Sequence, residues 1–306
     1  MGQCSNKCCG NSASDKAPIG EGTETPDGPL NMDCVDDVNA ADDEALQQST
    51  SYFDREIAEL NVLKANGKDL KNGVPYKFKS GATYVGQWKN NMRDGYGCQT
   101  WSDGAKYEGQ WSKNLASGKG RFTHSDGDIY VGEWNSNMAS GIGIYYHKGS
   151  TTYRGQWSND LQDGHGAETW VEGAHYEGLF REGQKDGWGC YHWIDGSEYQ
   201  GKWADNVIDG AGMYLASDGR CFRGQWKESV IHGIGRYVWP GGREYSGHYL
   251  SDMKHGFGIF SWPDGRMYEG FWSHGKQSGQ GRYTTKDGNT KTAYWQDGRR
   301  TREEEE

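Results

Sequence analysis

Aromatic residues and glycines recur along most of this chain at one fixed spacing. The first aromatics of successive copies are evenly spaced, at Tyr84, Tyr107, Tyr130, Tyr153, Tyr176, Tyr199, Phe222, Tyr245 and Tyr268. In every copy a glycine follows two positions later and a second aromatic four positions later. Because side chains alternate between the two faces of a strand, Tyr84, Gly86 and Trp88 are expected on one face. A constant period of this kind is typical of a repeat array.

The second half of each copy predicts a partner strand. In the first copy, residues 90–94 are the expected loop and residues 95–101 the expected strand, and a turn at residues 102–105 leads into the next copy. Two glycines with a single residue between them, such as Gly95 and Gly97, leave room for a ring to lie over the backbone. We therefore expect an all-β repeat, an elongated single-layer twisted antiparallel β-meander of hairpins whose buried material is aromatic.

The array is expected to cover residues 71–298. Nine clear repeats start at Tyr84, and a degenerate segment stands at each end, the last of which keeps the register through Trp295. These segments are predicted to cap the edges of the sheet. Residues 299–306 are highly charged and are expected to form a solvated tail that discourages pairing at the edge.

A short amphipathic helix is predicted ahead of the array, over residues 49–67. Phe53, Ile57 and Leu60 share one side of this helix, and Gly67 is a natural stop. Two roles are open for the apolar side. It can pack on the array and cover its first edge, or it can dock to a partner.

Composition and charge exclude several classes of protein. The chain has 48 glycines and 14 tryptophans, and leucine is scarce in the array, so an ordinary aliphatic core cannot be built. No run of about 18 apolar residues is present, so no transmembrane helix is predicted. The net charge of -10 belongs to the first part of the chain, because residues 1–51 have ten acidic residues against two lysines and residues 71–298 have 25 of each sign. A neutral array gives no electrostatic footprint for nucleic acid.

The first ten residues, MGQCSNKCCG, are typical of an acylation signal. Gly2 is the position for N-myristoylation once Met1 is removed, although Asn6 stands where the pattern prefers Ser or Thr. One myristoyl chain binds membranes only marginally, and a second signal is needed for stable anchoring. Palmitoylation can supply it at Cys4, Cys8 and Cys9. The alternative is an N-terminus without modification. Residues 11–48 are polar and acidic, and are expected to be a flexible, disordered tether.

No arrangement of residues predicts catalysis, a metal site or a cofactor. The seven cysteines do not form a disulfide pattern, which favours a reducing, cytosolic environment. Cys98 and Cys190 share a repeat position but are four repeats apart, too far to bind one metal ion. His124 and His147 share another position and are expected to be surface residues. We therefore expect no enzyme activity.

The pattern YxGxW…GxG…DGxxY resembles the MORN (membrane occupation and recognition nexus) repeat, over nearly everything from Lys71 to Arg299. The resemblance implies an adaptor that binds protein partners, with a helical segment as one candidate, and some members of the family self-associate, so a homo-oligomer stays open. Large Tyr and Trp surfaces suit such recognition. The expected partner-binding groove consists of Tyr130, Trp134, Tyr153, Trp157, Tyr176, Tyr199 and Trp203. The alternative is that these rings are structural and buried against each other.

Together these features predict a non-catalytic scaffold that tethers protein partners to the cytoplasmic face of a membrane. The plasma membrane or another internal or cortical membrane would hold it as a peripheral, lipid-anchored protein. One alternative is a module that binds phosphoinositides or other acidic lipids directly, although a neutral array gains little from an anionic surface. Another is a regulatory subunit that localises an enzyme partner.

Overall fold

The computed structural model describes residues 52–66 and 70–303. The predicted acylation signal and tether, residues 1–10 and 11–48, lie outside the described residues. The described residues form two compact units, an N-terminal unit that ends at Ile194 and a C-terminal unit that begins at Asp195.

The fold is all-β and antiparallel, as predicted, with 21 strands and one helix, α2, in the described residues. In the N-terminal unit each strand pairs with the next one along the chain. The elements of this unit are α2 (Ile57–Ala65), β1 (Tyr76–Lys77), β2 (Thr83–Lys89), β3 (Met92–Thr100), β4 (Lys106–Ser112), β5 (Leu115–Thr123), β6 (Ile129–Asn135), β7 (Met138–Tyr146), β8 (Thr151–Ser158), β9 (Leu161–Trp170), β10 (His175–Arg181) and β11 (Gln184–His192).

The C-terminal unit has the same sequential antiparallel pairing. Its strands are β12 (Glu198–Ala204), β13 (Val207–Leu215), β14 (Cys221–Lys227), β15 (Val230–Val238), β16 (Glu244–Leu250), β17 (Met253–Ser261), β18 (Met267–Ser273), β19 (Lys276–Thr284), β20 (Thr290–Gln296) and β21 (Arg299–Glu303). Each repeat thus contributes two strands, which confirms the predicted hairpin.

The turn inside each hairpin is tighter than the sequence predicted. In the first repeat, the expected loop over 90–94 is reduced to Asn90 and Asn91, and β3 begins at Met92. Both turn residues have positive φ, 53° and 55°. Two successive residues with positive φ match the twist of a two-residue hairpin, and Asn tolerates this conformation better than most residues. The loop prediction was wrong because it assigned the first polar residues of the second strand to the turn.

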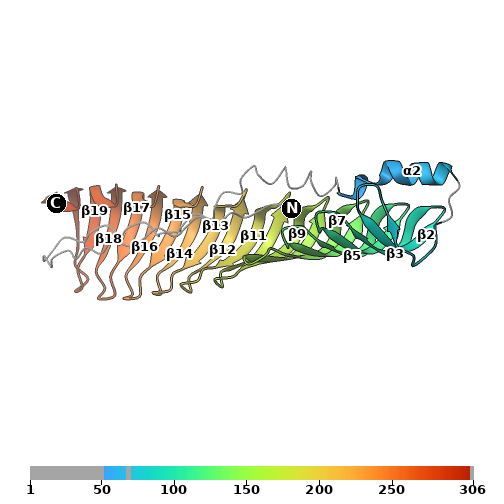
Figure 1. Ribbon diagram of the computed structural model, residues 1–306. Coiled ribbons are helices and arrows are strands. Elements are labelled where there is room, and N and C mark those ends of the chain that lie inside the picture. The colour runs from blue at the N-terminus through green and yellow to red at the C-terminus, as the bar shows by residue number, and fades with distance from the viewer. Residues whose placement is uncertain (1–51, 67–69, 304–306) are drawn as a thin grey trace. The chain divides into compact units, whose positions relative to one another are not determined.

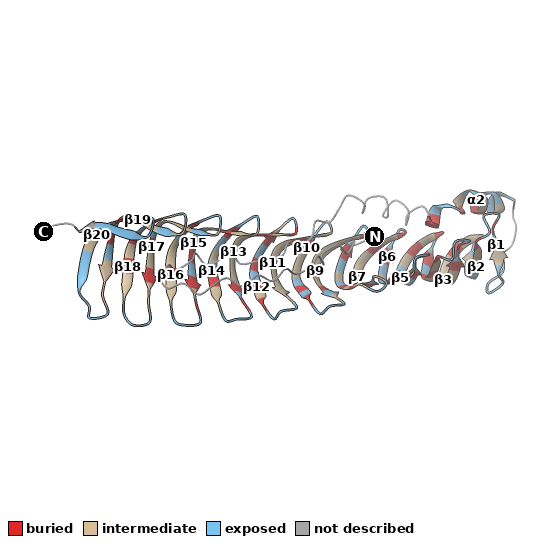
Figure 2. Cartoon of the chain, turned by 60° about the vertical axis from the view of Figure 1, so that its left-hand side comes forward, coloured by how far each residue is buried: buried red, intermediate tan, exposed pale blue. Residues whose placement is uncertain are grey.

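The core of each unit is made of rings on one face of the sheet. Tyr84 is fully buried and meets Trp88 of its own repeat and Trp111 of the next edge-to-face, at ring-centroid distances of 4.7 and 5.7 Å. Its hydroxyl donates a hydrogen bond to the carbonyl oxygen of Gln87 at 2.9 Å, and burial raises the pKa of the phenol. Figure 2 shows this burial as bands that recur from strand to strand. Edge-to-face packing therefore replaces the aliphatic core that the sequence lacks.

The two glycines of each pair are required for different physical reasons. A Cβ atom added at Gly97 would lie 2.2 Å from the hydroxyl oxygen of Tyr84, so this glycine makes room for the ring, as predicted. Gly95 has a φ of 96° and a Cβ there would meet the Gln87 side chain, which accepts a hydrogen bond from the backbone N–H of Tyr96. The first glycine of the pair is therefore required by backbone conformation, and the ring argument was wrong for it.

Helix α2 packs on the N-terminal unit, the first of its two predicted roles, and its Glu59 accepts a hydrogen bond from the Tyr76 hydroxyl (Figure 1). The helix spans only Ile57–Ala65, and the residues just before it carry the deepest contact, because Phe53 is fully buried. Leu60 is also buried, whereas Ile57 is only half-buried.

The C-terminal residues Arg299–Glu303 form strand β21 and pair with β20, where a solvated tail was expected over 299–306. Asp297 and Gly298 have the same positive φ as the other hairpin turns, so a degenerate hairpin still forms here. Its charged side chains occupy the last strand, where they disfavour further strand addition.

Candidate functional site

The candidate site in the described residues is a cluster of aromatic rings packed around Phe53. The N-terminal ring box consists of five rings whose centroids lie 5.4 to 5.9 Å from that of Phe53: Trp101, Tyr107, Trp111, Phe122 and Trp134. Most of these contacts are edge-to-face, an arrangement worth about 0.5–1.5 kcal/mol per pair beyond the area buried. One aromatic side chain from outside the sheet thus fills a space between repeats.

The repeat period explains why these five rings meet. Trp111 and Trp134 occupy the same position in two consecutive repeats, and Tyr107 is the first aromatic of its repeat. Trp101 directly follows β3, and Phe122 lies in β5. All five therefore lie in or directly beside successive strands and face the same side of the sheet.

A buried arginine lies beside the box. Arg93 is fully buried and its guanidinium lies 4.2 Å over the ring of Trp111. Its Nη atoms donate hydrogen bonds to the Gln99 side chain at 3.0 Å, the Asn114 carbonyl at 3.0 Å and the Phe53 carbonyl at 3.4 Å. Burial lowers the pKa of Arg93 to about 10. A buried guanidinium with these acceptors holds the backbone of the docked segment.

A buried carboxylate completes the contact. Glu56 stands three positions after Phe53, is only 1% exposed, and accepts hydrogen bonds from the Trp101 indole at 3.2 Å and the Ser80 hydroxyl at 2.9 Å. Its charge also raises the pKa of Arg93, opposing the effect of burial. The docked segment is therefore recognised by an aromatic ring and a carboxylate one helical turn apart.

Polar contacts at the rim keep the segment in register. Asp103 accepts hydrogen bonds from the Tyr52 hydroxyl at 2.7 Å and from Arg55 at 3.3 Å. Glu59 accepts one from the Tyr76 hydroxyl at 2.8 Å, and burial together with this carboxylate raises the pKa of Tyr76 to about 12.

The residues of the predicted partner-binding groove are all buried within the repeats. In the N-terminal unit Tyr130 packs on Trp157 at 5.1 Å and Tyr153 on Trp157 at 5.1 Å. In the C-terminal unit Tyr199 packs on Trp203 at 5.6 Å. The complete set Tyr130, Trp134, Tyr153, Trp157, Tyr176, Tyr199 and Trp203 is 0 to 6% exposed. These rings pack against each other within the repeats.

Sequence reasoning missed Arg93 and Glu56. The repeat period holds a signal for the first, because the position nine places after the first aromatic is basic three times, at Arg93, Lys185 and Lys254. Lys185 is also buried, donates a hydrogen bond to Glu168 at 2.9 Å and lies 5.0 Å over Trp170. No comparable signal marks Glu56, because an acidic residue on a short helix is usually exposed.

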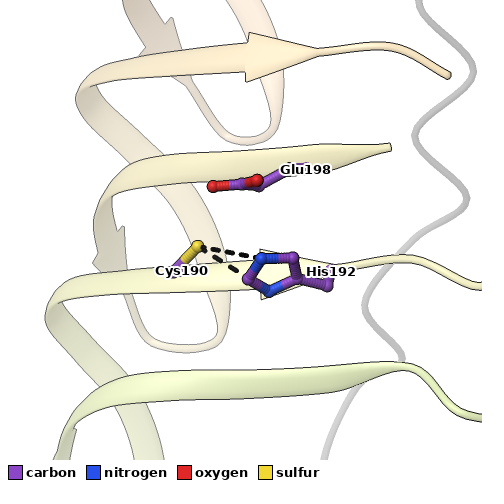
Figure 3. A group of neighbouring side chains, drawn as sticks. All are labelled: Cys190, His192 and Glu198. Atoms are coloured by element: carbon purple, nitrogen blue, oxygen red, sulfur yellow. Dashed lines mark hydrogen bonds between the residues drawn. The ribbon is translucent and has the colours of Figure 1, made fainter. Parts of the chain in front are cut away.

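The candidate metal ligands do not form a complete site within either unit. Figure 3 shows Cys190 and His192 next to each other on β11, with the sulfur 3.8 Å from each ring nitrogen. His192 also stacks on His175 at 4.2 Å. Within a single unit, the described residues hold no group of three His, Cys, Asp or Glu side chains whose ligand atoms come close enough to bind one ion. A structural zinc ion takes four ligands.

The two histidines expected on the surface are half-buried. His124 packs on Phe122 at 4.5 Å and on Tyr145 at 6.5 Å, and burial lowers its pKa to about 4. His147 contacts Asp128 through Nδ1 at 2.5 Å. The surface prediction was wrong because both occupy the repeat position of Trp101, which faces the ring side of the sheet.

The predicted lipidation sites Gly2, Cys4, Cys8 and Cys9 lie outside the described residues. In the part of the chain that the structure describes, no helix is both long and apolar enough to cross a membrane.

The sequence matches the MORN repeat family in nine segments, at residues 84–106, 107–129, 130–151, 153–175, 176–198, 199–219, 222–242, 245–265 and 268–290. These segments cover more than half of the chain and agree with the hairpins seen in the structure. The chain therefore belongs to the MORN-repeat family.

Solved structures show only a distant likeness. The G-box domain of the microcephaly protein CPAP aligns with 15% identity over 66% of this chain and 100% of that domain, with a TM-score of 0.37. The SAS-4 (dCPAP) TCP domain of Drosophila melanogaster, in complex with a proline-rich motif of Ana2, aligns with 10% identity over 58% of this chain and 90% of that one, with a TM-score of 0.34. No curated protein matches the sequence.

Proposed function

We propose that this MORN-repeat protein is a non-catalytic scaffold, anchored by acyl chains, that tethers protein partners to the cytoplasmic face of a membrane. The observation that carries the proposal is the docked segment of the N-terminal unit. Phe53 and Glu56 are buried against the repeats through side-chain contacts that do not need strand pairing. A surface that binds one helical segment in this way is suited to binding others.

The anchor is supported by the chemistry of the first residues. Gly2 can take a myristoyl chain, and the thiols of Cys4, Cys8 and Cys9 can take palmitoyl chains. Two such signals give stable membrane attachment where one does not. The membrane is the plasma membrane or another internal or cortical membrane.

Protein partners fit the array better than lipid headgroups do. Residues 71–298 carry 25 acidic and 25 basic residues, so no excess of positive charge attracts an anionic surface. Each Lys or Arg near such a surface contributes only about 1 kcal/mol. Aromatic rings in a well-packed pocket suit protein recognition instead.

The test compares the full-length protein with a Gly2→Ala variant and with a Cys4→Ser/Cys8→Ser/Cys9→Ser variant in cells. Membrane pelleting and metabolic labelling with alkyne-tagged myristate and palmitate are measured for each. We expect Gly2→Ala to lose both labels and become soluble, and the triple variant to keep the myristate label but bind membranes weakly. If both variants remain in the membrane fraction, the anchor is wrong and direct binding of the array to lipid replaces it.

A further inference from the structure

The C-terminal unit repeats the N-terminal ring box at a distance of seven full repeats. Each ring of the first box has an aromatic counterpart at the same repeat position, seven repeats further along the chain. These five counterparts form what we call the C-terminal ring box: Trp262, Tyr268, Trp272, Tyr283 and Trp295. This box plays no part in the proposed membrane anchor.

The contacts of the central tyrosine are alike in the two boxes. Tyr268 meets Trp272 at 5.3 Å and Trp295 at 5.0 Å, both edge-to-face. The corresponding distances from Tyr107 in the N-terminal box are 5.0 and 5.2 Å. The C-terminal box thus keeps the Tyr–Trp contacts of the box that holds Phe53 in the other unit.

The charged groups around the box are also repeated. Lys254 occupies the repeat position of Arg93, and its Nζ lies 5.3 Å over Trp272, as Arg93 lies over Trp111. Asp264 corresponds to Asp103. It pairs with Arg266 of its own unit at 2.8 Å, whereas Asp103 pairs with Arg55 of the docked segment at 3.3 Å. The arginine that the docked segment supplies in the first box is therefore supplied in the second by the turn before β18, and the Arg266 guanidinium lies 5.3 Å over the ring of Trp262.

Two rings of the second box are more exposed than their counterparts in the first, whereas Tyr268, Trp272 and Trp295 are buried in the same way as theirs. Trp101 and Phe122 are 3% and 1% exposed beneath Tyr52 and Phe53. Trp262 and Tyr283, their counterparts, are only half-buried. Among the described residues of the C-terminal unit there is no helix to play the part of α2. The indole N–H of Trp262 is the counterpart of the one from which Glu56 accepts a hydrogen bond in the first box.

We propose that the C-terminal ring box is a docking site for a helical segment of a partner protein that carries an aromatic residue and, three positions later, a carboxylate. The aromatic side chain enters between Trp262, Tyr268 and Trp272. The carboxylate lies against Trp262 and Lys254, where its negative charge complements the lysine. The segment that the chain itself docks in the N-terminal unit is the template for this partner.

The test uses the full-length protein, purified without acyl chains, and a labelled synthetic peptide of residues 49–66 as the probe. Affinity is measured by fluorescence anisotropy. We expect one binding event, weakened about tenfold or more by Trp262→Ala or Lys254→Glu in the protein and by Phe53→Ala or Glu56→Gln in the peptide. Lys276→Glu, the same charge change at an exposed residue of β19, is the matched control and should bind normally. Thermal unfolding of each variant verifies that it folds.

A charge exchange gives the sharpest result. A peptide with Glu56→Lys should bind poorly to the natural protein and recover affinity for the Lys254→Glu variant. If the natural peptide does not bind, or if Trp262→Ala and Lys254→Glu leave its affinity unchanged, the proposal is wrong. It is also wrong if binding is lost only in a Trp101→Ala variant, which would mean exchange with the chain's own segment. Concentration-dependent self-association that Phe53→Ala abolishes would instead identify a second copy of this chain as the occupant. None of these outcomes depends on the acyl anchor.

Discussion

At the scale of single residues, the fold depends on the smallest side chain lying beneath the largest rings. Tyr245 is fully buried, and a Cβ atom added at Gly258 would lie 2.3 Å from its hydroxyl oxygen. The same relation links Tyr84 with Gly97 in the N-terminal unit. A methyl group has no space there unless the ring moves, and the ring is held by its neighbours on both sides.

We therefore expect Gly258→Ala to destabilise the protein by about 1–3 kcal/mol, the usual cost of overpacking. Gly241→Ala is the control, because a Cβ at Gly241 meets nothing within 4 Å and its φ is not in the left-handed region. Urea unfolding followed by tryptophan fluorescence measures both. Equal midpoints for the two variants would show that the glycine is not needed for the ring.

A single buried residue, His124, also makes the stability of the protein depend on pH. Burial against Phe122 and Tyr145 lowers the pKa of His124 to about 4, and the nearby Asp126 and Asp128 only partly oppose this. In the unfolded chain this imidazole has a pKa of about 6.5. The unfolded chain therefore takes up the proton first. The stability that neutral His124 contributes is fully present above pH 6.5 and is lost as the pH falls through 6.5 towards 4.

Between pH 6.5 and pH 4 we expect His124 to account for a loss of up to about 3 kcal/mol in the free energy of unfolding. A His124→Phe variant removes the titrating group and keeps a ring at this position, so its stability should fall less over the same range. Thermal unfolding at half-unit steps of pH measures the difference. Parallel curves for the two proteins would contradict the assignment.

At the scale of elements, the segment from Tyr52 to Ala65 acts as a cover for the first repeats. It contributes Phe53 to the N-terminal ring box and Glu56 to the hydrogen bonds of Trp101. It also supplies the carbonyl that accepts from Arg93. The short α2 helix is stabilised by this packing, since isolated helices of such length are marginal in water.

Replacing Phe53 with alanine should cost about 3–5 kcal/mol, as for other buried aromatic side chains. The loss should be local, so we expect faster hydrogen exchange in strands β3 to β6 and in α2 and little change in the C-terminal unit. Val62→Ala, at an exposed position on the same helix, is the control. Faster exchange across the whole chain would show that the segment supports more than its own repeats.

At the scale of the whole molecule, stability is expected to be a sum of repeats and the contacts between neighbouring repeats. In the described part of each unit, the strands pair only with their neighbours along the chain. A complete repeat can therefore be removed without changing which side chains face the rings. Removing half a repeat would join strands that run in the wrong direction.

Deletion of residues 222–244, one full period, should leave a folded protein with a cooperative unfolding transition. Deletion of residues 222–233, about half a period, should give a protein that loses its tryptophan burial or aggregates. Circular dichroism and tryptophan emission distinguish the two results. A full-repeat deletion that unfolds would mean that the repeats are not interchangeable.

The sequence by itself determined the fold, because the constant period carries the strand alternation, the turn glycines and the ring positions at once. It also carries the family, through the same residues. The lengths of the turns and the existence of the last strand were established only by the structure. Polar residues such as Arg93 and Asp94 suit a loop or the end of a strand equally well from sequence alone.

Only the tertiary structure decided which residues make a site. Arg93 and Glu56 are ordinary charged residues in the sequence, and their burial depends on Phe53 entering the box from a segment outside the array. The hydrogen bonds of that contact join positions far apart in the chain, so no local pattern reports them. Once the contact is known, the period itself points to Lys254 and Trp262 as the matching pair, because residues at one repeat position face the same side of the sheet in every copy.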